Sequence, residues 1–503
     1  MNFKRYKHQQ EVLDSIEEYV NKGKNAGRIV VPTGGGKTRI EAEVVSKYGI
    51  NKNNNFSASL VLFHRIALGQ QHIGLGSTPQ DPRGFRQWIG FDGWRAVAFH
   101  SGEHSAPVGI SLRDEPQTTD VNVIKNSIKR QKKLGNYTIV FSTYQSYHKL
   151  IDIDFDVVIA DESQFLVQEK YFYVFKDLKA SLKFCFTATE RWTDSDNGFG
   201  LNNKNIFGDR ICTIKASDLI DRDIIVSPKI HIIETSIIED VSYIVDLCIR
   251  IGRYHHLSFI KSAGFSKTLF AVSNSKDLKQ ILESQDQIRR FLPEHDIFII
   301  HTNELIGTSK NGNQIKNRNM FLDEVKKSKN CLIFHYDILS EGIDIAGITG
   351  VAILRSMKTC KLLQTIGRAL RKCVIDDKNV KPHALVTIPV WDNCEDDWVN
   401  IQKHIIALKG LGFKIDENLD ISFELIKDAK ERIDLEKEKD LPDLVSVEDY
   451  KVKANKKLES VRHLAEQNVV EEALNFILHE VKTTKNFNAM KKLYEYCEMK
   501  GLT

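Results

Sequence analysis

The stretch Val31-Pro32-Thr33-Gly34-Gly35-Gly36-Lys37-Thr38 decides the first part of the fold. It follows the apolar run Ile29–Val31 and precedes a segment with helical spacing, Arg39–Tyr48. Glycines between a strand and a helix let backbone N–H groups turn towards phosphates, and the helix N-terminus adds partial positive charge. A glycine-rich turn with a chance Lys-Thr pair is disfavoured by this context, although Val31 stands where the general pattern has Gly. The stretch therefore predicts a phosphate-binding loop.

The loop residues have distinct predicted roles. Lys37 would reach the β- and γ-phosphates of ATP, and the Thr38 hydroxyl would bind Mg²⁺. The remaining residues expected to contact the nucleotide are Pro32, Thr33, Gly34, Gly35 and Gly36.

A pair of acids follows another apolar run. Val157–Ala160 ends in Asp161 and Glu162, and in isolation two acids after a strand mark only the start of a loop. In the same sheet as a phosphate-binding loop, however, they suit a nucleotide hydrolase. We expect Asp161 to hold Mg²⁺ through its water shell and Glu162 to polarise the attacking water.

Continuous apolar runs recur along residues 1–215, with helical patterns between them. Such runs are typical of a parallel sheet that is covered on both faces. A similar series begins near Lys229, so we expect two doubly wound α/β lobes, 1–215 and 229–392, joined by a linker at 216–228. The runs are 29–31, 60–63, 96–99, 138–141, 157–160 and 184–186, then 268–272, 297–300, 331–334, 351–354 and 384–388.

Two arginines of the second series are candidates for transition-state stabilisation. Arg368 and Arg371, within Gln364–Arg371, are three residues apart, and a helix would place both on one face. Guanidinium groups that face a nucleotide stabilise charge on the γ-phosphate. A helix with two solvated arginines is the alternative. The element Ser340–Ile345, with carboxylates and a glycine after an apolar run, favours the first interpretation.

Composition sets wide bounds. The chain has 503 residues, 42% hydrophobic and 27% charged, and this length predicts two or three domains. Its net charge of +4 says little, so a local groove would have to bind any nucleic acid. We expect neither a transmembrane helix nor a secretory signal, because no apolar run is long enough. The eight cysteines form no Cys-x-x-Cys pair, which favours buried thiols in a reducing, cytoplasmic compartment over a zinc site.

Taken in order, these elements resemble the motif series of superfamily 2 helicases and translocases over residues 5 to 372. The resemblance implies two tandem RecA-like lobes that bind ATP and Mg²⁺ in the cleft between them. Tyr6 and Gln9 look like the adenine-reading element ahead of the phosphate-binding loop. Gly342 and Asp344 look like a nucleotide-binding element of the second lobe, and Gln364 shares the catalytic motif of the two arginines.

The same resemblance identifies candidate nucleic-acid contacts. Leu62–Leu68 is similar to the first nucleic-acid-contact motif, and Phe141–Ser146 is similar to the next. Contacts are expected mostly with phosphates, because a motor tracks the strand backbone without reading bases. The predicted contact residues of the first lobe are Arg65, Thr143, Tyr144 and Gln145. In the second lobe, Asn274 and Thr302 are candidates because they stand at the ends of predicted strands.

Two positions depart from the common form of the family. Gln164 stands where many members have His in Asp-Glu-Ala-His. Thr187-Ala188-Thr189, whose hydroxyls can link the nucleotide pocket to the other lobe, is followed by Glu190 where Pro is usual.

The motif variants are most similar to the restriction-subunit-like (ResIII-type) branch, which includes type I and III restriction motors and phage branch-migration helicases. This likeness implies DNA rather than RNA as the partner. We expect an ATP-dependent DNA helicase or duplex translocase that unwinds or migrates structured DNA in recombination, repair or replication. The alternatives are the motor of a restriction or defence system with a nuclease partner, an RNA-remodelling ATPase, and a nucleotide-dependent switch without motor activity. The presence of Lys37, Glu162 and Arg371 disfavours the switch.

Charged segments with helical spacing dominate from about residue 393. We expect 393–503 to be a mainly helical accessory region that packs on the second lobe or contacts nucleic acid or a protein partner. A loose nuclease pattern, Pro442-Asp443 with Asp449 and Lys451, fits a chance match in a Lys- and Asp-rich segment better than a nuclease. The polar segment Thr308–Asn319 is predicted to be a surface loop.

Overall fold

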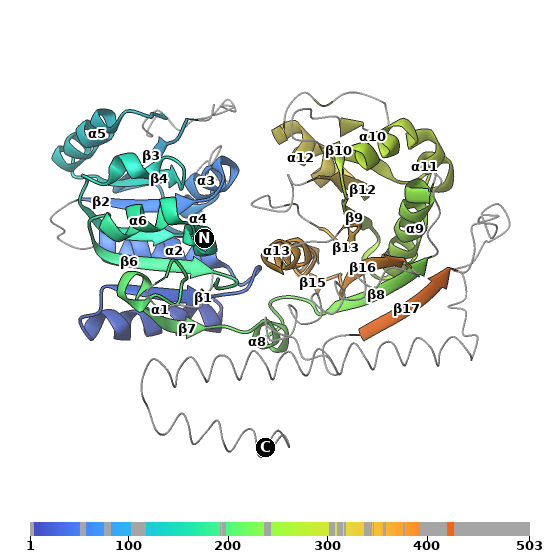
Figure 1. Cartoon of the computed structure of the whole chain (residues 1–503), viewed down its shortest axis with the longest axis horizontal. Coiled ribbons are helices and arrows are strands. Elements are labelled where there is room, and N and C mark those ends of the chain that lie inside the picture. Colours follow the sequence, from blue (N-terminus) through green and yellow to red (C-terminus); the bar gives the residue numbers. More distant parts are fainter. Residues whose placement is uncertain are drawn as a thin grey trace, which may run out of the picture. The chain divides into compact units, whose positions relative to one another are not determined.

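The computed structural model divides into two compact units, Met1–Ile225 and Val226–Thr503, called here the first and second lobes. Each is an α/β lobe built on a largely parallel sheet (Figure 1). The fold class predicted from the sequence, two RecA-like parallel-sheet lobes, is confirmed. The structure describes residues 5–50, 57–74, 82–101, 117–191, 193, 198–235, 243–300, 307–308, 315, 318–336, 345, 347–355, 359–375, 378–391 and 420–426.

The first lobe contains a seven-stranded sheet of order β3-β4-β2-β5-β6-β1-β7, in which every neighbouring pair is parallel. Parallel strands end at the same edge, so the segments that follow β1, β2, β4, β5 and β6 lie at one edge of the sheet. The strands are β1 (Ala26–Val30), β2 (Ala58–Phe63), β3 (Trp94–Phe99), β4 (Tyr137–Thr143), β5 (Phe155–Ala160), β6 (Ala180–Thr187) and β7 (Asp209–Thr213).

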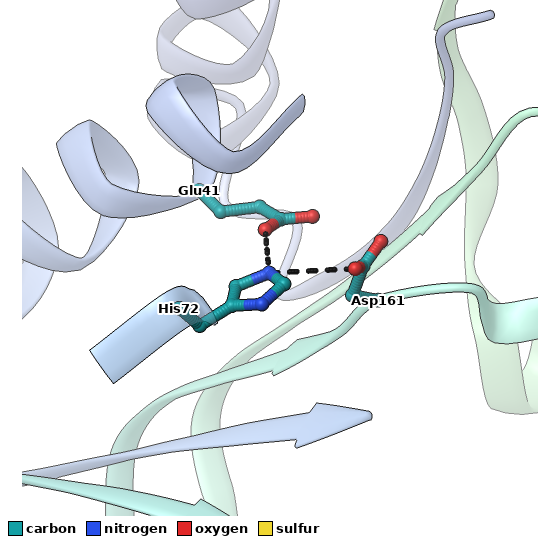
Figure 2. A group of neighbouring side chains, drawn as sticks. All are labelled: Glu41, His72 and Asp161. Atoms are coloured by element: carbon teal, nitrogen blue, oxygen red, sulfur yellow. Dashed lines mark hydrogen bonds and ion pairs between the residues drawn. The ribbon is translucent and has the colours of Figure 1, made fainter. Parts of the chain in front are cut away.

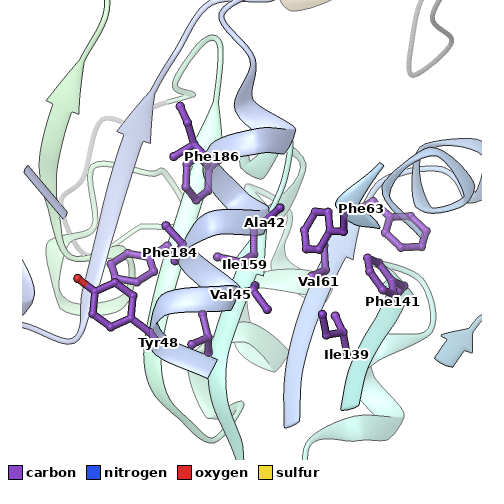
Figure 3. Packing of buried hydrophobic residues seen from close by; sticks show 14 of the residues in the cluster. Ala42, Val45, Tyr48, Val61, Phe63, Ile139, Phe141, Ile159, Phe184 and Phe186 are labelled. Carbon is purple, nitrogen blue, oxygen red and sulfur yellow. The ribbon is translucent and has the colours of Figure 1, made fainter. Parts of the chain in front are cut away.

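Helices cover both faces of this sheet, which explains why its strands are apolar throughout. On one face, Val61, Phe63 and Phe141 pack with Ala42 and Val45 of α2 (Figure 3). Alternate strand residues join a second cluster on the other face with α5 and α6. The helices are α1 (Lys7–Asn21), α2 (Lys37–Val45), η1 (Ser46–Ile50), α3 (Ile66–Ile73), α4 (Phe85–Ile89), α5 (Val121–Lys133), η2 (Tyr147–Leu150), η3 (Ser163–Leu166), α6 (Glu169–Asp177), α7 (Lys204–Phe207) and α8 (Ala216–Asp221). The last of these lies in the segment predicted to be a linker.

The second lobe contains an eight-stranded sheet of order β11-β10-β12-β9-β13-β16-β8-β17, parallel except for the pair β10–β11. The strands are β8 (Pro228–Thr235), β9 (Ser266–Ala271), β10 (Asp296–Ile300), β11 (Gly307–Thr308), β12 (Asn330–His335), β13 (Gly350–Ile353), β16 (Ala384–Trp391) and β17 (Asp420–Ile426), with a separate hairpin of β14 (Val374–Ile375) and β15 (Lys378–Asn379). The helices are α9 (Tyr243–Ala263), α10 (Ser275–Glu283), α11 (Gln285–Phe291), α12 (Arg318–Lys327) and α13 (Thr359–Ala369).

Strand β17 is an element that the sequence did not predict within 393–503, a region expected to be mainly helical. It pairs in parallel with β8 along its whole length, from Asp420 opposite Lys229 to Ile426 opposite Thr235, and so belongs to the second sheet. Its sequence alternates apolar and polar residues from Ile421 to Leu425, the period of two that is typical of a strand. The rest of 393–503 lies outside the described residues, as does the nuclease-like pattern, and only the ends of the predicted loop Thr308–Asn319 and Ile315 lie within them.

A search of the described helices finds none that is long and apolar enough to cross a membrane.

Candidate functional site

The predicted phosphate-binding loop connects β1 to α2 in the first lobe. Gly34 and Gly36 have φ angles of 89° and 77°, in the left-handed region that glycine adopts most easily. Gly36 is the N-cap of α2. Because glycine has no side chain, no N-cap side chain bonds the backbone N–H groups of the first turn of α2. The loop is held at its start because Val31 N donates to the Thr187 carbonyl at 2.9 Å. This backbone geometry fits the binding of a phosphate group.

The start of α1 packs against the loop. His8 Nε2 donates to the Gly35 carbonyl at 2.8 Å, and Gln9 Oε1 accepts from Tyr6 N at 3.1 Å. A Cβ atom at Gly36 would lie 2.3 Å from Gln9 Nε2, and the φ angle of 77° also favours glycine there. The predicted adenine element, Tyr6 and Gln9, therefore lies beside the loop, with the Tyr6 ring 53% exposed. His8, which the sequence did not single out, makes the direct contact with the loop.

Lys37 at the start of α2 faces the predicted catalytic carboxylate. Its Nζ lies 3.5 Å from Glu162 Oε1, and both side chains are largely buried. Burial alone would lower the pKa of Lys37, but the nearby carboxylates, Glu162 first, outweigh burial and raise it. The lysine therefore carries a full positive charge beside the phosphate-binding loop.

Glu162 is held by a chain of side chains across the end of the sheet. Its φ of 51° is unusual for a non-glycine residue. Gln164 Nε2 donates to Glu162 Oε2 at 2.8 Å, and Gln164 Oε1 accepts from the Thr187 hydroxyl at 2.6 Å. That hydroxyl in turn accepts from Thr189 N at 3.0 Å. Gln164 therefore bridges two motifs through one amide, which offers a donor and an acceptor.

Asp161 lies in a buried cluster with Glu41 of α2 and His72 of α3 (Figure 2). His72 Nε2 lies 3.0 Å from Glu41 Oε2 and 3.4 Å from Asp161 Oδ2. Its Nδ1 lies 2.8 Å from the Leu68 carbonyl, which can only accept, so Nδ1 carries a proton. Two carboxylates then face Nε2, which favours the imidazolium form.

The ionisation of this cluster follows from burial and charge. Burial would lower the pKa of His72, but hydrogen bonds to Asp161 and Glu41 raise it well above its ordinary value. Burial would raise the pKa of Asp161, but His72 and Lys37 lower it. Burial and the charge of Asp161 raise the pKa of Glu41 to about 7. Asp161 is thus the acid that stays ionised, as a ligand for Mg²⁺ must be.

The predicted nucleic-acid contacts of the first lobe follow β2 and β4. Phe63 and Thr143 are register partners at the ends of these strands, so Arg65 and Gln145 follow neighbouring strand ends. Arg65 is partly exposed and Gln145 is exposed, whereas Thr143 is buried with its hydroxyl 3.1 Å from Ser146 Oγ.

Tyr144 does not fit its predicted role as a contact side chain. It is fully buried, and its hydroxyl donates to the Asp161 carbonyl at 2.6 Å. The tyrosine therefore supports the end of β5 from inside the core.

The arginine motif of the second lobe differs in part from the prediction. Gln364 and the buried Arg368 lie on α13, but the helix ends at Ala369, so Arg371 lies beyond it. The prediction that one helix presents both arginines on one face is therefore wrong. Burial lowers the pKa of Arg371. Lys381 Nζ, which the sequence did not identify, donates to the carbonyls of Ala369 and Ile348, the latter at 2.9 Å.

Asn274 has a structural explanation in the second lobe. It is the N-cap of α10, where its Oδ1 accepts from Asp277 N at 2.9 Å. Gly342, Asp344 and Thr302 lie outside the described residues.

Comparison with known proteins finds a family match for part of the chain and solved structures of similar fold. Residues 2–191 match the family model described as "Type III restriction enzyme, res subunit". The structure of the ATP-dependent Type ISP restriction-modification enzyme LlaBIII bound to DNA is similar, with a TM-score of 0.62 and 14% identity over 98% of this chain and 36% of that chain. A nuclease-deletion mutant of the Type ISP enzyme LlaGI with a DNA substrate mimic has a TM-score of 0.58 and 15% identity over 97% of this chain and 34% of that chain.

The likeness extends to a protein bound to RNA. S. cerevisiae Dbp5 with RNA and ADP BeF3 has a TM-score of 0.50 and 12% identity over 85% of this chain and 92% of that chain. A search of curated protein sequences finds no match. The chain spans about a third of the length of the two Type ISP enzymes.

Proposed function

We propose that the chain is a helicase-type ATPase motor, whose residues 2–191 match the restriction-subunit family model, and that it couples ATP hydrolysis to unwinding or branch migration of structured DNA. We further propose that it acts in recombination, repair or replication. One observation carries the proposal: the phosphate-binding loop, Glu162 and the candidate strand contacts all follow parallel strands that end at the same edge of one sheet.

ATP and Mg²⁺ fit the residues at this edge. The left-handed glycines and the first turn of α2 offer N–H groups to the phosphates, and Lys37 adds a charge beside them. Thr38 and Asp161 would hold Mg²⁺, which neutralises charge on the phosphates when it is bound. Tyr6 and Gln9 would contact the adenine.

Hydrolysis would then depend on the orientation of Glu162. Its carboxylate positions and polarises the attacking water, and Gln164 fixes one of its oxygens. Because Gln164 also contacts the Thr187 hydroxyl, a shift of the Thr187–Thr189 segment would move the carboxylate. From the second lobe, Arg368 and Arg371 would stabilise charge on the γ-phosphate, with Gln364 in the same motif.

The tracked strand would run over the segments that follow β2 and β4. Arg65 and Gln145 are the side chains with exposed surface there, and both suit phosphate contacts. Binding should therefore weaken steeply with salt and show little sequence preference. A site-specific binder with a flat salt response would contradict this assignment.

Strand displacement tests the proposal. The full chain is mixed with ATP, Mg²⁺ and a forked DNA, a four-way DNA junction, a linear DNA duplex or an RNA duplex of matched length. We expect ATP-dependent release of a strand from the fork or the junction. Release from RNA alone would replace the proposal with an RNA-remodelling ATPase, and the similarity to RNA-bound Dbp5 is the observation that favours an RNA partner.

A restriction motor is the second candidate. It is favoured by the match of 98% of this chain to a Type ISP restriction-modification enzyme, of which it spans 36%. Such a motor would move along linear duplex DNA without separating its strands and would need a nuclease partner. Displacement of a bound triplex-forming strand from linear duplex, without unwinding of the fork, would select this candidate.

A further inference from the structure

The segment from the end of β2 to the end of α3 touches the hydrolysis site at both of its ends. At its start, the His64 ring stacks on Phe165, with ring centroids 3.6 Å apart and planes 3° apart. Phe165 lies in η3, which begins directly after Asp161 and Glu162. The candidate phosphate contact Arg65 is the neighbour of His64 in the chain.

At the other end of α3, His72 joins three elements. Its Nδ1–H holds the Leu68 carbonyl of its own helix, while Nε2 faces Glu41 of α2 and Asp161 at the end of β5 (Figure 2). All three side chains of this cluster are buried. The imidazole is thus the bridge between the helix of the strand-contact motif and the acid that would hold Mg²⁺.

The packing of α3 leaves little room for it to move alone. A Cβ atom at Gly69 would lie 2.0 Å from Phe63 Cζ, so the helix backbone rests directly on this ring at the end of β2. Interiors this closely packed respond to displacement as units. A shift of α3 would therefore carry His72 with it and change the position of the Asp161 carboxylate.

We infer that His72 is a positioning residue that makes ATP hydrolysis depend on the strand bound at Arg65. A strand held at Arg65 fixes α3, and His72 then fixes Asp161 in the orientation that hydrolysis requires. The inference rests on the proposed function, because it needs a nucleic acid that stimulates hydrolysis. It adds to that function a residue that transmits the stimulation.

Two substitutions separate the two bonds of the imidazole. His72→Asn keeps an N–H donor at the position of Nδ1, towards the Leu68 carbonyl. It loses the Nε2 donor that faces the carboxylates of Glu41 and Asp161. His72→Gln keeps a donor near the position of Nε2 and loses the Leu68 bond. Gln71→Ala, at an exposed neighbour on the same helix, is the matched control. The measured quantities are the ratio of DNA-stimulated to basal kcat, the KM for ATP and the Mg²⁺ concentration that gives half the maximal rate.

We expect His72→Asn to lower the stimulation ratio about tenfold, in the range of typical coupling between sites. It should raise the Mg²⁺ requirement and leave the KM for ATP within about twofold. His72→Gln should keep most of the stimulation, and Gln71→Ala should behave as the parent. A purely structural role predicts the opposite order of the two histidine variants or equal losses in both.

The inference fails if His72→Asn is folded and keeps the parental stimulation ratio and Mg²⁺ requirement. If that variant does not fold, Phe165→Leu replaces it, because it removes the stack at the start of the segment and should also lower the ratio. An unchanged ratio in Phe165→Leu would then overturn the inference. A parent that no nucleic acid stimulates would instead contradict the proposed function, so the two failures are distinguishable.

Discussion

Two buried lysines, one in each lobe, show how the surroundings of a cation decide what it can do. Lys37 of the first lobe faces Glu162 at 3.5 Å, and carboxylates raise its pKa against the effect of burial. Lys381 of the second lobe donates to the backbone carbonyls of Ile348 and Ala369, and burial lowers its pKa to about 7. Both amines are buried, but only Lys37 is surrounded by ionised partners.

The difference suits Lys37 to the binding of an anion and Lys381 to a structural role. Paired carboxylates keep Lys37 charged beside a loop whose backbone suits phosphate, so an incoming anion meets a cation. Lys381 instead donates to the Ala369 carbonyl at the end of α13, as a side-chain cap, and to the Ile348 carbonyl ahead of β13. It holds the end of the helix that carries Arg368. We expect substitutions at the two positions to change different measurements.

The largest effect is expected for Lys37→Ala. The change removes the charge that holds the transferring phosphate, so ATP turnover should fall below detection. Lys183→Ala is the control in the same lobe, because Lys183 is a partly buried lysine that donates to the carbonyls of Phe175 and Lys176. The control should retain turnover. Parental turnover in Lys37→Ala would refute the phosphate-binding assignment.

The next effect concerns the arginines of the second lobe. Arg368→Ala and Arg371→Ala should each lower kcat by roughly 10³–10⁵ with a smaller change in ATP affinity, as expected for groups that act in the transition state. Steady-state kinetics and nucleotide binding measure the two quantities. Equal losses in affinity and rate would assign the arginines a structural role.

Glu162→Gln tests whether the carboxylate that faces Lys37 activates the attacking water. The amide keeps the shape and the neighbours of the carboxylate, but it cannot act as a base. We expect ATP binding to persist while kcat falls by roughly 10²–10⁴. The variant should stay on nucleic acid in the presence of ATP. A kcat equal to that of the parent would exclude Glu162 as the activating group.

The smallest effect is a change in stability with pH at Lys381. Its pKa is about 7 in the folded lobe, below the ordinary value of 10.5. Between these values the unfolded chain holds the proton that the folded lobe has released, so the stability of the folded lobe rises with pH, by at most about 1.4 kcal/mol per unit. Below about 7 both forms hold the proton, and this contribution is constant.

Lys381→Met removes that dependence. Relative to the parent, the variant should gain free energy of unfolding as the pH is lowered from 10 to 7, as measured by denaturant unfolding. The difference should then stay constant below 7. A difference that is constant from pH 7 to 10 would show that Lys381 keeps its proton in the folded lobe.

The sequence predicted the fold well where strands are apolar throughout. Runs such as 60–63 and 157–160 lie in fully buried strands, because a sheet covered on both faces leaves no polar side. Among the strands of five or more residues, β7, β8 and β17 were missed. Strands β7 and β17 are edge strands: β7 begins with two charged residues, and β17 follows a highly charged region in which only its period of two marks it.

The site was predictable where a local pattern carries the chemistry. The phosphate-binding loop and Asp161-Glu162 each follow a strand, so their spacing alone places them at one edge. Glu41 and His72 are different, because each is a single polar residue on a helix and only the folded chain brings both to Asp161. Tyr144 shows the converse error, since it lies within a predicted contact motif but its hydroxyl points inward to the Asp161 carbonyl.

The central claim is that DNA of a particular structure drives this ATPase. The most direct measurement is the steady-state ATPase rate at equal nucleotide concentration and fixed salt on forked DNA, a four-way DNA junction, linear duplex DNA and duplex RNA, with Lys37→Ala as the background. We expect the fork or the junction to give the highest rate. A higher rate with RNA than with every DNA form would contradict the account.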